Sequence, residues 1–260
     1  MDILVLLKQV PSTESIIEIA ADGTSIKTDE LKWVINPYDE FAVEEALRLR
    51  EAHGGTVTIL TLGREKATEA VRTALAMGAD KGVLISDPAL EDCDNLGTAK
   101  ILAAAAKDIP YDLIIAGQRA VDDDAYAVGS AVAEAFNIPS LVMVIKLEIK
   151  ENRIRCHQTI DGGLAVVEAP LPALITTQRG LNEPRYASLP GIMKAKKKPL
   201  DTKTLADLGL DPQTFAKPKI KVVALKLPPE RSGGQLIEGE TPQEKARELV
   251  RILHEEAKVI

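Results

Sequence analysis

The feature that most constrains the fold of this chain is an alternation of short apolar runs with longer amphipathic runs. Apolar runs of strand length occupy residues 3–7, 56–62, 82–86 and 112–117. Runs with helical spacing lie between and after them, at residues 39–53, 65–78 and 96–107. Because alternating strands and helices form parallel strands joined by crossover helices, the pattern predicts an α/β fold with a mainly parallel sheet flanked by helices.

The helical run at residues 39–53 indicates how such a helix covers the sheet. Its apolar residues recur at spacings of three and four, which places them on one face. That face consists of Ala42, Val43, Ala46, Leu47 and Leu49. The opposite face carries Glu44, Glu45, Arg48 and Glu51. We therefore expect an amphipathic helix with its apolar face against the strands.

The pattern changes after about residue 140. Two strand-like runs meet at Glu151-Asn152, and a further run has prolines at its edges. From Pro190 onward, short proline-bounded pieces and a final charged helix are more typical of an arm than of a second core. We expect one α/β domain over residues 1–190 and an extended C-terminal arm over residues 191–260.

Charge and cysteine content exclude several classes of protein. The formal net charge of −7 argues against general nucleic-acid binding, which requires positive surface. Cys93 and Cys156 have neither metal-ligand nor disulfide-framework spacing, so we expect no metal site and a reducing compartment. The apolar run at residues 3–7 is too short for a signal peptide or a spanning helix. We expect a cytoplasmic protein with no targeting segment and no direct membrane insertion.

The carboxyl ends of the predicted strands are the expected walls of a ligand pocket, because ligands of open parallel sheets bind there. Four segments lie at these ends, at residues 8–11, 35–40, 61–63 and 116–129. The chain has neither the G-x-G-x-x-G nor the Walker fingerprint, so a nucleotide would be held in another way. A helix beginning near Asp124 would leave free N–H groups for a phosphate at Ala125, Tyr126, Ala127 and Val128. The alternative is that the three aspartates at residues 122–124 only cap that helix.

Other candidate site residues have simple structural alternatives. Asn36 could bind an adenine or ribose, but asparagine before proline is also typical of a turn. Tyr38 at the same strand end could contact a partner's ligand or close the local core. The three histidines share no motif with a nucleophile, so we expect no bond chemistry by this chain alone.

The segment LNEPRYASLPGIMKAKKKP, at residues 181–199, has no helical or strand period over its length. One interpretation is a crossing loop with a solvated basic end. The other is a docking loop in which Leu189 is an exposed anchor and the lysines attract an acidic partner. The residues alone leave both open.

Together these motifs resemble those of the β subunits of electron-transfer flavoproteins. The resemblance runs over nearly the whole chain. The segments that carry it are LLKQVP, INPYDEFAVEEALRL, TALAMGAD, AGQRAVDDDAYAVG, IDGG, LNEPRYASLPGIMKAKKK and PPERSGGQLIEG. TALAMGAD and LNEPRYASLPGIMKAKKK are long and specific.

The resemblance implies a heterodimer. An α subunit makes most of the contacts to a redox-active FAD, and the β subunit has a Rossmann-like α/β domain that binds a structural AMP. The arm over residues 191–260 is expected to wrap the α subunit. Electrons pass from an acyl-CoA or related dehydrogenase to a quinone-linked oxidoreductase, so the chain is expected to be a carrier subunit without catalytic residues of its own.

The resemblance also assigns site residues. The cofactor-binding positions correspond to Leu6, Asn36, Leu62, Asp123, Asp124, Ala125, Tyr126, Ala127 and Val128. Tyr38 corresponds to an aromatic that approaches the flavin ring. The loop that docks the dehydrogenase, with Leu189 as its inserted leucine, corresponds to Tyr186, Leu189, Pro190, Ile192, Met193, Lys194, Lys196, Lys197 and Lys198.

Two alternatives stand beside this interpretation. A bifurcating branch of the family holds a second FAD in place of AMP, with a threonine and a glutamine where this chain has Ala125 and Ala127. With alanine there, phosphate binding would rest on backbone N–H groups. An alternative of another class is a free-standing adenine-nucleotide-binding regulator of the universal-stress type, which would not need the long C-terminal arm.

Overall fold

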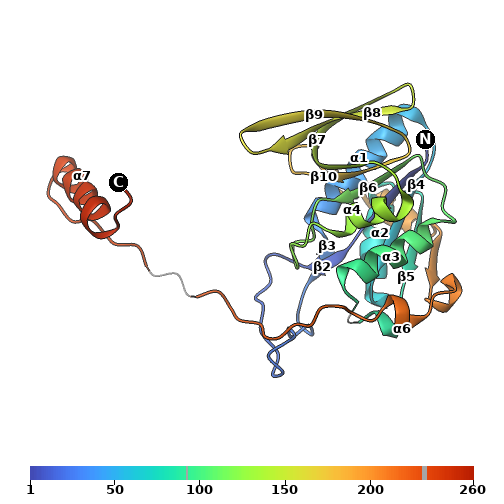
Figure 1. Cartoon of the computed structure of the whole chain (residues 1–260), viewed down its shortest axis with the longest axis horizontal. Helices are drawn as coiled ribbons and strands as arrows, with labels where there is room; N and C mark the ends of the chain where they lie inside the picture. Colours follow the sequence, from blue (N-terminus) through green and yellow to red (C-terminus); the bar gives the residue numbers. More distant parts are fainter. Residues whose placement is uncertain (92, 230–232) are drawn as a thin grey trace.

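A nine-stranded sheet forms the centre of the fold (Figure 1). The computed structural model describes residues 1–91, 93–229 and 233–260, so residues 230–232 of the C-terminal motif lie outside the described part. The strands are β1 Ile3–Leu6, β4 Val57–Leu62, β5 Lys81–Ile85, β6 Leu113–Gly117, β7 Ser140–Lys150, β8 Arg153–Ile160, β9 Gly163–Pro170, β10 Ala173–Thr177 and β11 Leu200–Lys203. Their spatial order is β11-β5-β4-β1-β6-β10-β7-β8-β9. All pairs from β11 to β7 are parallel, which confirms the predicted mainly parallel sheet.

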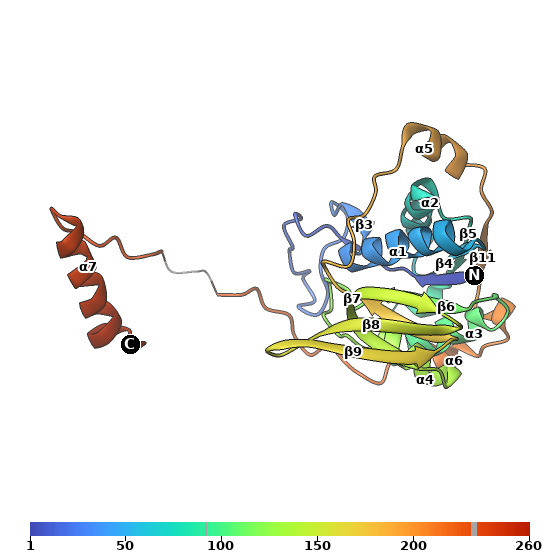
Figure 2. The same ribbon diagram turned by 90° about the horizontal axis from the view of Figure 1, so that it is seen from above.

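Helices cover both faces of the parallel strands (Figure 2). α1 (Pro37–His53) and α2 (Thr68–Met77) pack on one face, and α3 (Asn95–Ala106) and α4 (Val128–Phe136) pack on the other. Alternate residues of β1 serve the two layers, with Ile3 in the first core and Leu4 in the second. Burial on both faces explains why the strands read as continuous apolar runs.

The buried face of α1 agrees with its predicted apolar stripe, because Ala42, Val43, Ala46, Leu47 and Leu49 are all buried. Glu44 and Glu45 on the predicted opposite face are also buried, with exposed fractions of 2% and 9%. The segment after β10 returns across this side of α1 and bonds both carboxylates.

The antiparallel edge of the sheet is the part formed by β7, β8 and β9. The predicted turn between β7 and β8 is present, and both Glu151 and Asn152 have the left-handed backbone that such a two-residue turn needs. A small separate sheet pairs β2 (Gln9–Pro11) with β3 (Trp33–Ile35). Short 3-10 helices lie at η1 Glu65–Ala67, η2 Pro88–Leu90 and η3 Ala206–Leu208.

The chain after residue 190 has two parts. The first carries most of α5 (Leu189–Ala195), then β11 and α6 (Pro212–Phe215), and it packs on the sheet domain as far as the buried Ala216. The second is extended and leads to α7 (Pro242–Arg251) and the π-helical turn η4 (Ile252–Glu256), which stand apart from the sheet domain in Figure 1. Among the described residues, no helix combines the length and apolar character needed to cross a bilayer.

Candidate functional site

A cavity of about 240 Å³ opens at the carboxyl ends of β1, β4 and β6. All four segments predicted as pocket walls contribute to its lining. The predicted cofactor-binding residues that line it are Leu6, Asn36, Leu62, Asp123, Ala125, Tyr126, Ala127 and Val128. The fold therefore brings together side chains that are more than 120 positions apart in the sequence. This is the arrangement expected for a ligand site in an open parallel sheet.

The loop before α4 is longer than predicted, because the helix does not begin near Asp124. α4 begins at Val128, because Asp124 and Tyr126 have left-handed backbones with φ of 49° and 55°. The Ala125 N–H donates to Asp123 Oδ1 at 3.2 Å. Within the described part of the chain, the N–H groups of Tyr126, Ala127 and Val128 have no acceptor. These N–H groups, at the positive end of the helix dipole, are suited to an anion.

The three aspartates of this loop are each paired with a cation. Lys8 Nζ lies 2.8 Å from Asp122 Oδ1 and 3.4 Å from Asp123 Oδ2. Arg119 Nη1 lies 2.7 Å from Asp124 Oδ1. Because these pairs offset the carboxylate charge, the aspartates oppose an anion at the neighbouring N–H groups less than the sequence suggested.

Asn36 and Asp39 brace the loops around the cavity. The Asn36 side-chain amide donates to Arg119 O at 2.8 Å and to Asp39 Oδ1 at 3.0 Å, and its oxygen accepts the Val121 N–H at 3.1 Å. The Asn36 side chain, which was predicted to contact the ligand, therefore also has a structural role, because its hydrogen bonds hold the loop at residues 119–121.

Asp39 joins the ends of two strands to the first turn of α1. Its carboxylate accepts the Lys8 N–H at 2.7 Å and the Gly117 N–H at 3.1 Å. A Cβ at position 117 would lie 2.3 Å from Asp39 Oδ1, so the close approach requires glycine. Burial raises the pKa of Asp39 to about 7, and the N–H donors oppose that rise.

Arg119 contacts the rings of two tyrosines at the edge of the cavity. Its guanidinium carbon is 5.0 Å from the ring centroid of Tyr38 and 5.6 Å from that of Tyr126. Arg119 Nη2 also donates to Tyr38 Oη at 3.0 Å. The predicted flavin-side aromatic is thereby joined to the predicted nucleotide loop, while Tyr38 and Asp124 themselves lie outside the cavity lining.

Some lining residues lie outside the four predicted segments, and Gln118 lies inside one of them but was not singled out from the sequence. Gln118 is buried, and its Oε1 has no hydrogen-bond partner among the described residues. Asn95 and Thr98 at the start of α3 line the same cavity. The rule that strand ends face the ligand would have found α3, since that helix follows the end of β5. The side-chain direction of Gln118 had no signal in the sequence.

The second candidate site is the docking segment, defined here as residues 181–198. Four of its apolar side chains are exposed, with exposed fractions of 98% for Tyr186, 80% for Leu189, 66% for Met193 and 44% for Ile192. Pro190, Lys194, Lys196 and Lys197 are exposed as well. The helix α5, which carries Leu189, Ile192 and Met193, lies outside α2 on one side of the molecule (Figure 2).

Lys198 differs from the other predicted docking residues. Its ammonium group donates to the carbonyl oxygens of Leu75 at 2.9 Å, Gly78 at 3.2 Å and Ala79 at 2.6 Å. The side chain therefore satisfies the C-terminal end of α2 and does not face outward with Lys194, Lys196 and Lys197.

Comparisons with known proteins are consistent along the whole chain. A family model described as the electron transfer flavoprotein domain matches residues 24–208. The chain is 44% identical to electron transfer flavoprotein subunit beta of Bacillus subtilis, over 100% of both chains. It is 37% identical to the protein of the same name from Bos taurus, over 90% of this chain and 92% of the relative. It is also 37% identical to caffeyl-CoA reductase-Etf complex subunit CarD of Acetobacterium woodii, over 98% of each chain.

Proposed function

The chain belongs to the electron transfer flavoprotein family, as a β subunit with a role in electron transfer, and from this premise we propose that it binds a structural AMP and docks an acyl-CoA-type dehydrogenase. In this proposal it works in the cytoplasm as a heterodimer with an α subunit, which makes most of the contacts to a shared FAD. Electrons then pass to a quinone-linked acceptor. Membership of this family leaves little support for a free-standing regulator.

The observation that carries the AMP proposal is the set of N–H groups of residues 126–128, which have no acceptor among the described residues and lie beside carboxylates already paired with Lys8 and Arg119. A phosphate there would accept from backbone groups that are otherwise unsatisfied. Gln118 Oε1 is a further group in the wall without a partner in the described part of the chain, and it is suited to an N–H or O–H of the nucleotide.

Bound FAD would supply the redox chemistry, and this chain would contribute binding, orientation and charge. Tyr38 with its bonded Arg119 would offer an aromatic face and a fixed positive charge on the side expected to meet the flavin. The displayed side chains of the docking segment, led by Leu189, would bind the dehydrogenase.

The experiment that tests the nucleotide is to co-express the chain with its α subunit, release the bound nucleotides with acid, and quantify FAD and AMP per heterodimer. We expect one FAD and one AMP. Two FAD and no AMP would overturn the AMP assignment and support the bifurcating alternative. One relative is named as part of a caffeyl-CoA reductase complex, so this alternative has a defined class of partner.

A single substitution locates the site. Ala127→Asp places a carboxylate at the N-cap of α4, where its negative charge repels a phosphate bound at the N–H groups of residues 126–128. We expect loss of AMP with FAD retained. Ala89→Asp adds the same charge at an exposed position outside the cavity lining and is the matched control. Full AMP content in Ala127→Asp would contradict the site.

A further inference from the structure

The docking segment is tied down at both ends, while its middle is exposed. Residues 182–185 bond α1, and residues 195–198 bond α2. Tyr186 and Leu189 lie between these ends and are the most exposed apolar side chains of the segment. Such an arrangement differs from a flexible loop that becomes ordered only on binding.

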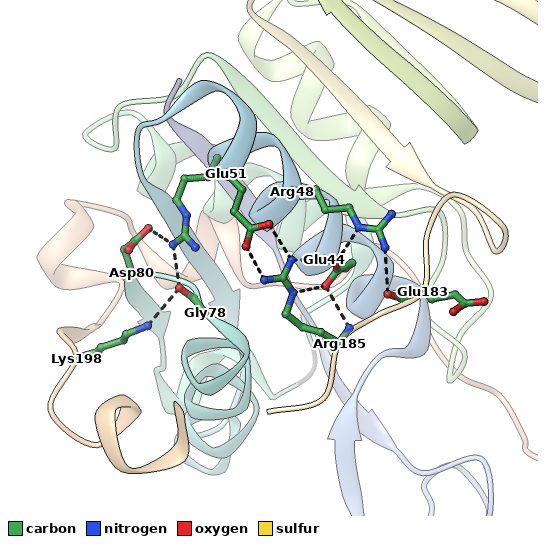
Figure 3. Close-up of polar contacts among 9 residues, drawn as sticks. Glu44, Arg48, Glu51, Gly78, Asp80, Glu183, Arg185 and Lys198 are labelled. Atoms are coloured by element: carbon green, nitrogen blue, oxygen red, sulfur yellow. Dashed lines mark hydrogen bonds and ion pairs between the residues drawn. The ribbon is translucent and has the colours of Figure 1, made fainter. Parts of the chain in front are cut away.

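The front anchor is the pair of Arg185 and Glu44 (Figure 3). Arg185 Nε donates to Glu44 Oε2 at 2.7 Å, and Nη2 donates to Oε1 at 3.1 Å. The Arg185 backbone N–H donates to the same Oε2 at 3.2 Å, so backbone and side chain are both fixed. Glu44 has an exposed fraction of 2%, which shields these bonds from competing water.

Two further contacts strengthen the front anchor. Arg185 also makes a bidentate pair, or fork, with Glu51, in which Nη1 donates to Oε1 at 2.6 Å and Nη2 donates to Oε2 at 3.3 Å. Asn182 Nδ2 donates to Phe41 O at 3.0 Å and to Glu45 Oε2 at 2.9 Å. Glu44 and Glu51 are two helical turns apart on α1, so the guanidinium is aligned along the helix.

The rear anchor is formed by Lys198 and Arg72. The Lys198 ammonium binds the carbonyl groups at the end of α2, as described above. In return, Arg72 Nη1 of α2 donates to Ala195 O at 2.6 Å and to Lys198 O at 2.7 Å. Gly191 fits this contact because a Cβ there would lie 2.4 Å from Ala76 O. The two long sequence motifs, TALAMGAD and LNEPRYASLPGIMKAKKK, therefore pack against each other.

We propose that Arg185 is a positioning residue for dehydrogenase docking, which it serves by holding residues 182–185 on α1 so that Leu189 is presented in its binding geometry. Lys198 does the same from the rear. The inference rests on the proposed docking function of Leu189. Fixing the segment before binding removes the entropy cost of ordering it at the moment of association.

The test uses the complete α/β heterodimer and a purified acyl-CoA dehydrogenase, with KM for the carrier and kcat measured separately. Arg185→Gln removes both forks, and we expect KM to rise about tenfold with kcat within about twofold. Arg185→Lys keeps one charged contact and should recover part of the loss. Arg153→Gln, an exposed arginine on β8, is the matched control.

A double-mutant cycle with Leu189→Ala separates positioning from direct contact. If Arg185 acts through Leu189, Arg185→Gln should change KM less than about twofold when Leu189 is already alanine. Equal effects in both backgrounds would overturn the proposal. So would an unchanged KM in Arg185→Gln when Leu189→Ala alone raises it.

Two further measurements guard against ambiguous outcomes. Amide hydrogen exchange of residues 186–195 should speed up in Arg185→Gln, and unchanged exchange would overturn the anchor. If Leu189→Ala leaves KM unchanged while exchange responds to Arg185→Gln, the docking function fails and the role in docking proposed for Arg185 fails with it. If Arg185→Gln does not fold, Glu51→Gln removes only the outer fork, and we expect a KM increase of about threefold.

Discussion

The cavity and the docking segment are both held by buried carboxylates of α1, but with different donors. Asp39 at the first turn accepts neutral N–H groups from Lys8, Gly117 and Asn36. Glu44, further along the helix, accepts the guanidinium groups of Arg48 and Arg185.

The pKa values of the two acids move in opposite directions. Burial raises the pKa of Asp39 to about 7. Burial alone would also raise the pKa of Glu44, but the hydrogen bonds from Arg185 and Arg48 outweigh it and hold that pKa below its ordinary value. Neutral N–H donors to Asp39 thus hold the ends of strands β1 and β6 inside the domain. The cationic donors to Glu44 hold the docking segment on the surface.

Of the substitutions at these two sites, Asp39→Ala is expected to have the largest effect on stability. It leaves the N–H groups of Lys8 and Gly117 and the amide of Asn36 without their buried acceptor, at about 1–3 kcal/mol each. We expect a loss of unfolding free energy on the order of 4 kcal/mol, together with loss of nucleotide. Thermal unfolding and nucleotide content of the heterodimer measure it.

Glu40→Ala is the control for that variant. Glu40 is the neighbouring carboxylate on α1, and its side chain forms no hydrogen bond within the described residues. A melting temperature of Asp39→Ala equal to that of Glu40→Ala would show that the brace is not needed.

Leu189→Ala is expected to have an intermediate effect, confined to the docking segment. Because Leu189 is displayed with an exposed fraction of 80%, its removal should leave the fold and the nucleotides unchanged. Dehydrogenase docking should weaken by about 1–3 kcal/mol, measured as a dissociation constant. Ile16→Ala, at an apolar residue with an exposed fraction of 87%, is the control. Loss of nucleotide with unchanged docking would assign Leu189 to the fold.

The smallest expected effect is the pH dependence of the front anchor. The pKa of Glu44 in the folded protein is below its ordinary value of 4.5. Its ion pairs therefore stabilise the folded protein at pH values above 4.5, and this stabilisation is lost as the pH falls through the folded pKa. We expect protease cleavage within residues 181–198 to increase below about pH 4.5. Glu44→Gln should be cleaved more readily already at pH 7, with a weaker pH dependence. Equal pH profiles for the two proteins would contradict the role of Glu44.

The position of the cavity could be predicted from the sequence because it follows from topology. Parallel strands place their carboxyl ends at one edge, so Leu6 and Leu62 had to lie near each other. Asn36 does not follow from this rule, because it comes after β3 of the small antiparallel sheet and lies in the cavity wall as the residue before α1. The loop before α4 could not be predicted in the same way. Its aspartates are typical helix caps, but Asp124 and Tyr126 adopt left-handed backbones and delay the helix to Val128.

The docking segment also could be predicted only in part from the sequence. The lack of a period over the whole segment left an exposed docking loop as one of two interpretations. Leu189 is exposed, and it lies at the start of the short helix α5, which that lack of a period did not predict. Lys198 was grouped with its neighbouring lysines because sequence proximity was the available signal. The contact that draws it inward comes from α2, about 120 residues earlier in the chain.

The sequence by itself determined the alternation of strands and helices, the apolar stripe of α1 and the family, because each depends on local spacing or on long continuous motifs. The tertiary structure decided which polar residues are buried. Glu44 reads as a surface residue of an amphipathic helix, yet it is covered by Arg185, 141 positions away. Local periodicity predicts only which face of one helix packs on the core. A buried ion pair also needs a second segment that packs on the helix from elsewhere in the chain, and no local pattern shows where that segment lies.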